Sequence, residues 1–445
     1  MAQVPVPEKI AVLQSKAVPN PAPPATDPKV YQEHHDAFAA EGLPKTPEAW
    51  LERAKKVSDI LAVDAAARNK EQKTPRAEVA LLKSSGLTKI LGDPKYGGGG
   101  QNWDTALKCV RQVAIGDGSI GMLLGYHLMW SRIAAIVGTE EQRERYEKLI
   151  NENNYYVGGA VNPRDNDSVI AEAGGKLVLN GFKNFTTGAA VSDLVVLEGV
   201  YDGAEDHIFA LVPTNQPGIV FLNNWNNMGL RLTESGAAKL MQVNFPWEDA
   251  LGWNTETKTA IKELVAGPFS TIMVPIIQLV FANFYIGIAY GALRTGSEYT
   301  KTQTRAWPFS HDPKSSPLEE HYILARYGKS FASLKAAEAL ADKAGDELAA
   351  LFAAHGVSRD ITERQRGDLA ELVTALKIVV THTCLEVTSS IFEVTGSRST
   401  SERYGFDRFW KDIRTHTLHD PVAYKETELG RYYLLDEIPK PSWYT

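Results

Sequence analysis

The stretch THTLHDP, residues 415–421, gathers two imidazoles and a carboxylate within a few positions. His416, His419 and Asp420 could exchange protons near neutral pH, because imidazole donates and accepts there and an adjacent carboxylate can fix its tautomer. Two other interpretations use the same residues. The histidines could serve packing or helix capping, since histidine is of intermediate burial. They could also form part of a metal site, but no complementary His or Cys cluster completes it, so no metal is expected.

The motif lies in a chain of 445 residues with a formal net charge of −7. That length exceeds one ordinary core and predicts two or three domains. The acidic balance disfavours nucleic-acid binding, which needs clustered Lys and Arg. Cys109 and Cys384 are far apart in the sequence, which argues against a disulfide framework or a zinc site. A reducing, cytoplasmic environment fits this cysteine usage best.

One segment, Leu264 to Leu293, contains no charged residue and is long enough to span a bilayer. Pro268, Pro275 and Asn283 interrupt it, and no Lys or Arg cluster flanks it. We therefore expect no membrane span but a helix buried on all sides. An apolar surface this extensive also predicts a homotetramer, or at least a dimer, with this helix near the inter-subunit bundle.

The elements that must position the motif fall into four segments. Residues 1–45 are rich in Pro and Ala and predict an extended N-terminal arm. Residues 46–153 predict a helical domain, which opens with a Thr cap and Pro at the first helical position. Residues 154–255 consist of short β-branched and aromatic runs, typical of a small antiparallel barrel or sandwich. Residues 256–445 return to long helical patterns.

This order of segments resembles the acyl-CoA dehydrogenase superfamily. NGFKNFTTG, residues 180–188, is similar to the family segment that passes behind the flavin, and residues 228–246 resemble a later strand of the same domain. The resemblance implies an α+β fold: an N-terminal helical domain, a central antiparallel β-barrel or sandwich, and a C-terminal four-helix bundle. No GxGxxG, Walker or G-x-S-x-G motif competes with it.

Within the superfamily, residues 117–128, 275–293, 298–308 and 403–425 are similar to the flavin-dependent dibenzothiophene monooxygenase group. The resemblance implies a two-component enzyme that takes reduced FMN from a separate NAD(P)H:flavin reductase. With O2 it would form a C4a-hydroperoxide and oxygenate a small aromatic or heteroaromatic molecule. Oxidation at sulfur is the first expectation, and N- or ring hydroxylation the second.

The opening motif acquires roles from this resemblance. Dehydrogenases of the superfamily place a catalytic glutamate where this chain has Asp420, which is one methylene shorter and is followed by Pro421. Proton abstraction requires hydrogen-bond-range placement, so the change disfavours dehydrogenation. His419 and His416 would instead stabilise the hydroperoxide while its O–O bond breaks.

Other cofactor and pocket residues follow from the same resemblance. The Thr187 hydroxyl would reach flavin N5, and Phe185, placed on the same strand face by the two-residue period, would pack near the ring. Trp225 is a similar candidate, Asn166 is a further cofactor-binding candidate, and the Tyr126 hydroxyl would line the flavin and substrate pocket.

Two positions of the expected pocket lack the polar residues of the sulfur-oxidising relatives. Met122 and Gly159 stand where a histidine and an asparagine are expected. Their loss removes hydrogen-bond partners and would enlarge the cavity, so we expect a largely apolar substrate pocket.

Arginines are the candidates for binding the flavin phosphate, because their guanidinium forks bind phosphate oxygens in pairs. Arg305 corresponds to the superfamily arginine that reaches the phosphate from a neighbouring subunit, while Arg398 and Ser399 replace a Gly-rich turn beside the diphosphate. A cation there favours FMN over FAD. Two alternatives stay open: an acyl-CoA dehydrogenase with FAD, and a non-catalytic flavin-binding protein that needs neither His419 nor Thr187.

Overall fold

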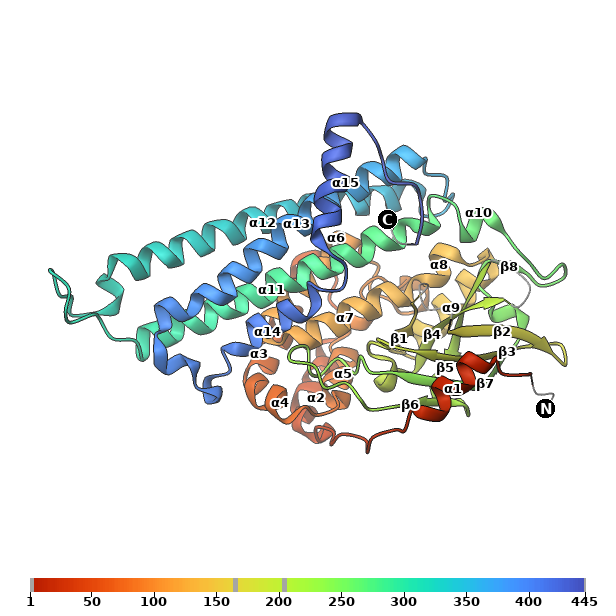
Figure 1. Ribbon diagram of the computed structural model, residues 1–445, viewed down its shortest axis with the longest axis horizontal. Coiled ribbons are helices and arrows are strands. Elements are labelled where there is room, and N and C mark those ends of the chain that lie inside the picture. Colours follow the sequence, from red (N-terminus) through yellow and green to blue (C-terminus); the bar gives the residue numbers. More distant parts are fainter. Residues whose placement is uncertain (1–3, 163–166, 202–205, 444–445) are drawn as a thin grey trace.

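The computed structural model describes residues 4–162, 167–201 and 206–443. Figure 1 shows long helices along the length of the molecule, with the β-sheet gathered at one end and the N-terminal helices beside both. This arrangement has the predicted acyl-CoA dehydrogenase-like architecture of a helical part, a sheet and a helical bundle.

The N-terminal part is helical. Its helices are α1 (Glu8–Lys16), α2 (Gln32–Glu41), α3 (Pro47–Ala62), α4 (Ala65–Glu71), α5 (Arg76–Ser84), α6 (Trp103–Gly116), α7 (Gly118–Ser131), α8 (Ile133–Val137) and α9 (Glu140–Glu152). The Thr46 side chain accepts from Ala49 N at the start of α3, which confirms the predicted cap. The expectation that residues 1–45 are extended needs correction, because α1 and α2 lie within them.

The sheet is mixed rather than antiparallel. Its strands are β1 (Val157–Ala160), β2 (Ser168–Ala173), β3 (Lys176–Lys183), β4 (Leu194–Tyr201), β5 (His207–Pro213), β6 (Ile219–Phe221) and β7 (Ala238–Phe245), with a separate short pair, β8 (Trp253–Asn254) and β9 (Thr259–Ala260). β4 pairs in parallel with β1 and β2 and antiparallel with β5. Alternation along single strands could not reveal these directions, because the same two-residue period serves both kinds of pairing.

The C-terminal part is a bundle around one apolar helix. It comprises α10 (Lys262–Val265), α11 (Met273–Thr302), α12 (His321–His355), α13 (Glu363–Thr395), α14 (Asp407–His416) and α15 (Val422–Leu435). α11 can approach α6 closely because of its glycines: a Cβ at Gly287 would lie 2.3 Å from Arg111 O, and one at Gly291 would lie 2.5 Å from Ile115 O. This close packing fixes the face of α11 that supplies the site described below.

The uncharged segment is buried within its own chain. Of the apolar window in Lys262–Thr302, 83% is buried, although its length and composition alone would allow it to cross a membrane. By length and composition alone, Gly118–Val137 and Glu363–Thr395 could also cross a membrane. The prediction of a buried helix is confirmed, and its placement near an inter-subunit bundle stays a prediction.

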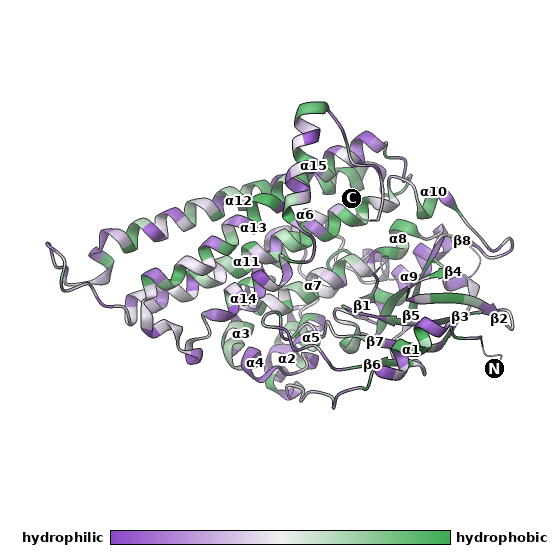
Figure 2. Cartoon of the chain, in the orientation of Figure 1, coloured by the Kyte–Doolittle hydropathy of each residue, from purple (hydrophilic) through white to green (hydrophobic). Residues whose placement is uncertain are grey.

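Exposed apolar side chains lie instead on the outer helices of the bundle. α15 projects from the rest of the molecule and carries hydrophobic residues at its far end (Figures 1 and 2). The exposed large apolar side chains of this region are Tyr322, Leu324, Phe331, Val379, Tyr424, Tyr433, Leu434 and Leu435. α12, α13 and α15 therefore each carry apolar side chains at the surface of the bundle.

Candidate active site

His416, the last residue of α14, is buried between two tyrosines. Its Nδ1 lies 2.7 Å from Tyr285 Oη of α11, and its Nε2 lies 3.3 Å from Tyr126 Oη of α7. The imidazole also packs edge-on against Phe281 and Phe284, with ring centroids 4.3 and 5.0 Å apart. The first histidine of the motif therefore joins three helices at one point.

The electrostatics of this cluster keep all three groups neutral. Burial, together with the nearby His419 and Lys377, holds the pKa of His416 well below its ordinary value. Burial and the Asp420 carboxylate raise the pKa of the Tyr126 and Tyr285 hydroxyls. A neutral imidazole has one N–H donor and one acceptor nitrogen, so one tyrosine donates to the ring and the other accepts from it. Both ring nitrogens thus have protein partners, which leaves neither directed at a metal.

His419 lies outside this buried cluster. Its ring stacks on that of His416 with centroids 5.5 Å apart and an interplanar angle of 15°, and half of its side chain (50%) remains exposed. Its Nδ1 lies 3.1 Å from Asp420 Oδ1, the contact expected of a neighbouring carboxylate. The structure brings the whole motif together but gives the buried position to His416.

Asp420 is engaged by partners on three sides. Lys377 of α13 forms an ion pair with its carboxylate, His419 contacts Oδ1, and Gln278 Nε2 donates to both oxygens at 3.4–3.5 Å. Burial alone would raise the pKa of Asp420, but the hydrogen bond from His419 and the charge of Lys377 lower it below its ordinary range. A carboxylate stabilised in its charged form is a poor base for removing a proton from carbon.

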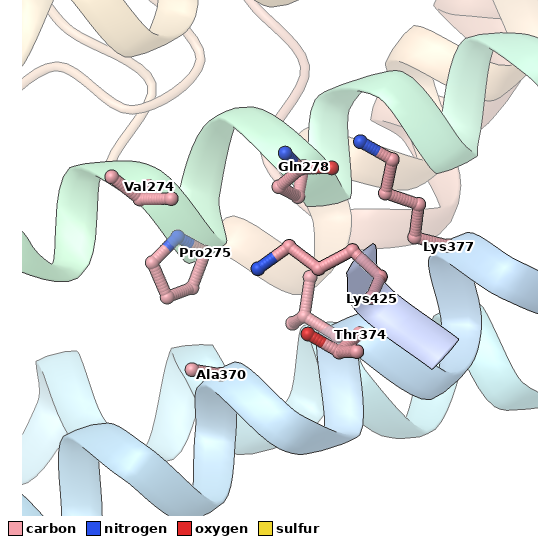
Figure 3. A pocket seen from close by; sticks show the side chains of 8 residues that line it. Val274, Pro275, Gln278, Ala370, Thr374, Lys377 and Lys425 are labelled. Atoms are coloured by element: carbon pink, nitrogen blue, oxygen red, sulfur yellow. The ribbon is translucent and has the colours of Figure 1, made fainter. Parts of the chain in front are cut away.

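A narrow cavity lies behind Asp420, between α11, α13 and α15. Gln278 and Pro275 line one side of it, and Lys377 and Lys425 extend toward α11 from the other (Figure 3). Lys425 Nζ is itself 2.8 Å from Glu428. The two lysines are thus each paired with an acid.

Thr187 occupies a tight turn that leaves the sheet. β3 ends at Lys183, whose buried ammonium pairs with Glu198 of β4 at 2.6 Å and fixes the point of departure. Phe185 and Gly188 then adopt φ values of +57° and +70°. The expectation that Phe185 and Thr187 share a strand face is therefore wrong, because the lysine anchor and the left-handed residues end the strand first.

The turn is held against a second segment, residues 230–236. Thr186 N and Gly188 N donate to Gly236 O at 3.0 Å and Thr233 O at 2.9 Å. The buried Thr187 Oγ1 lies 2.8 Å from Ser235 Oγ. The hydroxyl expected to face the flavin thus has a hydrogen-bonded support that the sequence motif did not indicate.

Phe185 and Trp225 form an open aromatic pair. Their ring centroids are 6.4 Å apart at an interplanar angle of 77°, and 63% of Phe185 is exposed. Trp225 Nε1 donates to Leu230 O at 2.7 Å, which ties the pair to the segment supporting Thr187. The structure brings both predicted aromatics to the same place, beside the Thr187 turn.

Met122 and Gly159 are both buried, but the space beside Gly159 is filled. A Cβ there would lie 2.3 Å from Trp130 Nε1, because the indole of α7 packs directly on the strand. The expectation that Gly159 enlarges the cavity is therefore wrong on this face. Gly159 N instead donates to Thr187 O at 3.3 Å, which links β1 to the turn.

Asp412 connects the imidazole cluster with the Thr187 support. It lies four residues before His416 on α14, so the two side chains share a face of the helix. Its Oδ1 accepts from Leu230 N at 2.6 Å. Burial raises the pKa of Asp412 to about 7. α14 therefore positions both His416 and the 230–236 segment.

The predicted phosphate-binding residues lie at the far end of the bundle. Arg305 is exposed just beyond α11, and Arg398 is exposed after α13, while Ser399 is buried with its hydroxyl 2.8 Å from Thr395 Oγ1. Tyr299 beside Arg398 is fourteen residues along α11 from Tyr285, roughly 21 Å. Within one chain these arginines are not adjacent to His416. Asn166 lies outside the described residues.

Three positioning contacts were missed at the sequence level: Tyr285 to His416, Lys377 to Asp420, and Ser235 to Thr187. Tyr285 and Ser235 lay inside stretches that the resemblance already covered. No spacing signal could have paired them, since each contact joins residues far apart in the chain. A single lysine within the apolar run of residues 375–380 is the signal that could have indicated Lys377, because a charge buried there needs an acidic partner.

The chain matches two family models. The acyl-CoA dehydrogenase N-terminal domain matches residues 37–151, and the acyl-CoA dehydrogenase C-terminal domain matches residues 279–423. The two matches flank the sheet and include α7, most of α11 and the whole of the opening motif.

Similar proteins of known name include two bacterial monooxygenases. The dibenzothiophene monooxygenase of Mycolicibacterium goodii is 37% identical over 81% of this chain and 88% of its own length. A probable FMNH2-dependent monooxygenase, SfnC of Pseudomonas putida, is 31% identical over 90% of this chain and 98% of its own. Among solved structures, the complex of TdsC from Paenibacillus sp. A11-2 with FMN and indole covers 89% of this chain and 100% of its own, with a TM-score of 0.83 and 30% identity.

Proposed function

The chain belongs to the acyl-CoA dehydrogenase family, as an FMN-dependent monooxygenase of that family, and we propose that it oxygenates a small aromatic or heteroaromatic molecule. Oxidation at sulfur is the first candidate reaction, since dibenzothiophene is the substrate named for the M. goodii relative. Hydroxylation at nitrogen or ring carbon is the second, since indole is the molecule bound in the TdsC complex.

The observation that carries the choice of reaction is the contrast between Asp420 and His416. Asp420 stands where dehydrogenases place their base, yet Lys377, Gln278 and His419 hold its carboxylate. His416 is a neutral imidazole between two hydroxyls. The site is thus built to pass a proton between neutral groups rather than to remove one from a thioester, which argues against the alternative of an FAD-dependent acyl-CoA dehydrogenase.

The residues around the turn fit a flavin ring. Phe185 and Trp225 offer an exposed aromatic pair, and Thr187 offers a hydroxyl on the adjacent turn. Reduced FMN would supply the electrons that activate O2, while Thr187 would bind the ring at N5 and Phe185 and Trp225 would pack beside it. A purely structural flavin-binding role would leave the Tyr285–His416–Tyr126 cluster without a purpose.

A separate flavin reductase is the partner, because the P. putida relative is named as FMNH2-dependent and reduced flavin has to be supplied to such an enzyme. The free, buried thiols of Cys109 and Cys384 suit a cytoplasmic setting in which such a reductase operates. Recovery of the native protein from a membrane fraction would contradict that location.

We also infer a homotetramer, in which Arg305 reaches the flavin phosphate of a neighbouring subunit. Arg305 is exposed and far from His416 within one chain, and α12, α13 and α15 expose apolar side chains that a partner could cover. Sedimentation velocity should give the mass of four chains, and Arg305→Ala should weaken FMN binding without changing that mass. A monodisperse monomer with bound flavin would contradict the assembly.

A product screen tests the substrate class. The protein, a flavin reductase, FMN, NADH and air are incubated with a thioether such as dibenzothiophene, with indole, with a phenol and with an aromatic amine. We expect an oxygenated product from at least one of them, and no NADH consumption by the protein without the reductase. Turnover of an acyl-CoA thioester alone, with none of the aromatic compounds oxidised, would overturn the proposal.

A further inference from the structure

We propose that Ser235 and Thr233 fix the direction of the Thr187 hydroxyl so that Thr187 can only accept a hydrogen bond from a bound flavin, which makes the site select the reduced form. This inference rests on the proposed function, and it assigns positioning roles to two residues that neither the family resemblance nor the comparisons single out.

Three hydroxyl groups form a buried chain that ends on a carbonyl. Thr187 Oγ1 lies 2.8 Å from Ser235 Oγ, which lies 2.7 Å from Thr233 Oγ1. Thr233 Oγ1 lies 2.9 Å from Leu230 O. The exposed fractions of these threonine and serine residues are between 0 and 4%, so bulk water does not compete for their protons.

The carbonyl sets the direction of every bond in the chain. Leu230 O can only accept, so Thr233 must donate to it, because two acceptor oxygens at that distance would repel. A hydroxyl has one proton, and that of Thr233 is now used. Ser235 must therefore donate to Thr233, and Thr187 must donate to Ser235. The proton of Thr187 is committed, and only its lone pairs face outward.

Leu230 is held in place by independent contacts. Its φ is +52°, its N–H donates to Asp412 at 2.6 Å, and its carbonyl also accepts from Trp225 Nε1 at 2.7 Å. Rotating the peptide that carries this carbonyl would break the Trp225 contact, and the Asp412 hydrogen bond holds the preceding peptide in place. The direction of the hydroxyl hydrogen bonds is thus set by Leu230, which Asp412 of α14 holds in place.

Reduced and oxidised flavin differ at the atom that Thr187 would contact. Reduced flavin carries a hydrogen on N5 and donates, whereas the bare N5 of oxidised flavin accepts. Reduced flavin can therefore donate a hydrogen bond from N5 to Thr187 Oγ1. Oxidised flavin instead places its N5 acceptor opposite the acceptor lone pairs of Thr187. A buried hydrogen bond made in one form and lost in the other corresponds to roughly a 10- to 100-fold difference in affinity.

The test compares dissociation constants of both flavin forms. Oxidised FMN is titrated in air, and photoreduced FMN is titrated under anaerobic conditions, each against the wild-type protein and its variants. We expect the wild type to bind reduced FMN about 10- to 100-fold more tightly. In Ser235→Ala the Thr187 proton loses its acceptor and can turn toward N5, so the ratio should fall about tenfold or more. The potential of bound FMN should fall by about 30 mV for each tenfold loss.

A second variant and a control separate hydroxyl direction from general damage. Thr233→Val removes the acceptor of the Ser235 proton while keeping the side-chain shape, so the affinity ratio should again fall. Ser192→Ala removes a hydroxyl that lies 2.7 Å from Thr214 in the same sheet region but outside the chain, and it should leave the ratio unchanged.

The possible outcomes separate the directional role of Ser235 and Thr233 from the proposed FMN-dependent oxygenation. If the wild type binds both forms equally, or if Ser235→Ala and Thr233→Val both keep the wild-type ratio, the directional role is wrong while FMN-dependent oxygenation stands. If the wild type binds neither form of FMN, the proposed function and this inference fail together.

Discussion

Replacing His416 by Gln should lower the amount of oxygenated product formed per reduced FMN by about 10²–10⁴-fold, the usual effect of losing a positioned acid or base. Glutamine can still hydrogen-bond to Tyr285 and Tyr126, but its amide cannot take up or release a proton near neutral pH. The electrons of reduced FMN should then appear in hydrogen peroxide instead of product. Product yield and peroxide are measured in the same reaction with a limiting amount of reduced FMN.

His419→Ala is the matched control for this prediction. Half of the His419 side chain is exposed, and its ring stacks on His416 and lies beside Phe281 at the edge of the cluster. We expect less than about a tenfold loss in coupled turnover, below the range for a positioned acid or base. Should His419→Ala lose as much as His416→Gln or more, the outer histidine is the proton donor and the buried one is packing.

Lys377→Met should destabilise the fold by about 3–5 kcal/mol, because it leaves the Asp420 carboxylate without its cation. Only 4% of the Lys377 side chain and 21% of that of Asp420 are exposed, so water replaces little of the lost interaction. The ion pair also joins α13 to the residues that follow His416. Urea unfolding followed by circular dichroism measures the difference, with one transition required for both proteins.

Two further variants show whether the pair itself is responsible. Lys377→Met combined with Asp420→Asn should recover most of the loss, since no unpaired charge remains. Lys329→Met breaks an ion pair with Glu386 on the same bundle, but those side chains are 60% and 54% exposed, so the unfolding midpoint should hardly move. An unchanged midpoint for Lys377→Met would mean that Asp420 is adequately solvated without it.

The sequence predicted the parts of the fold that depend on local pattern. The uncharged run became the buried α11, and Thr46 with Pro47 marked the start of α3. Hydrophobic periodicity specifies which face of an element is buried but not which partner covers it. The parallel pairing of β1 with β4, the helices within residues 1–45 and the exposed apolar end of α15 were therefore not predicted.

In the candidate site, too, the sequence indicated which residues take part but not which residues they contact. The motif identified His416, His419 and Asp420 together, but which histidine is buried depends on Tyr285, 131 residues away from His416. Gly159 was expected to open a cavity, yet Trp130 packs on it from α7. The support of Thr187 likewise depends on Ser235, 48 residues later. Such pairings follow from the packing of helices and strands, which no short stretch of sequence encodes.

Oxygen-isotope labelling tests the central claim most directly. Reduced FMN, generated by a separate reductase, is supplied to the protein under ¹⁸O2 with the best substrate of the screen, and the product is analysed by mass spectrometry. The account predicts one ¹⁸O atom in each product molecule, and no product when only oxidised FMN is supplied. Unlabelled product, or bleaching of bound flavin by an acyl-CoA thioester without any need for O2, would contradict it.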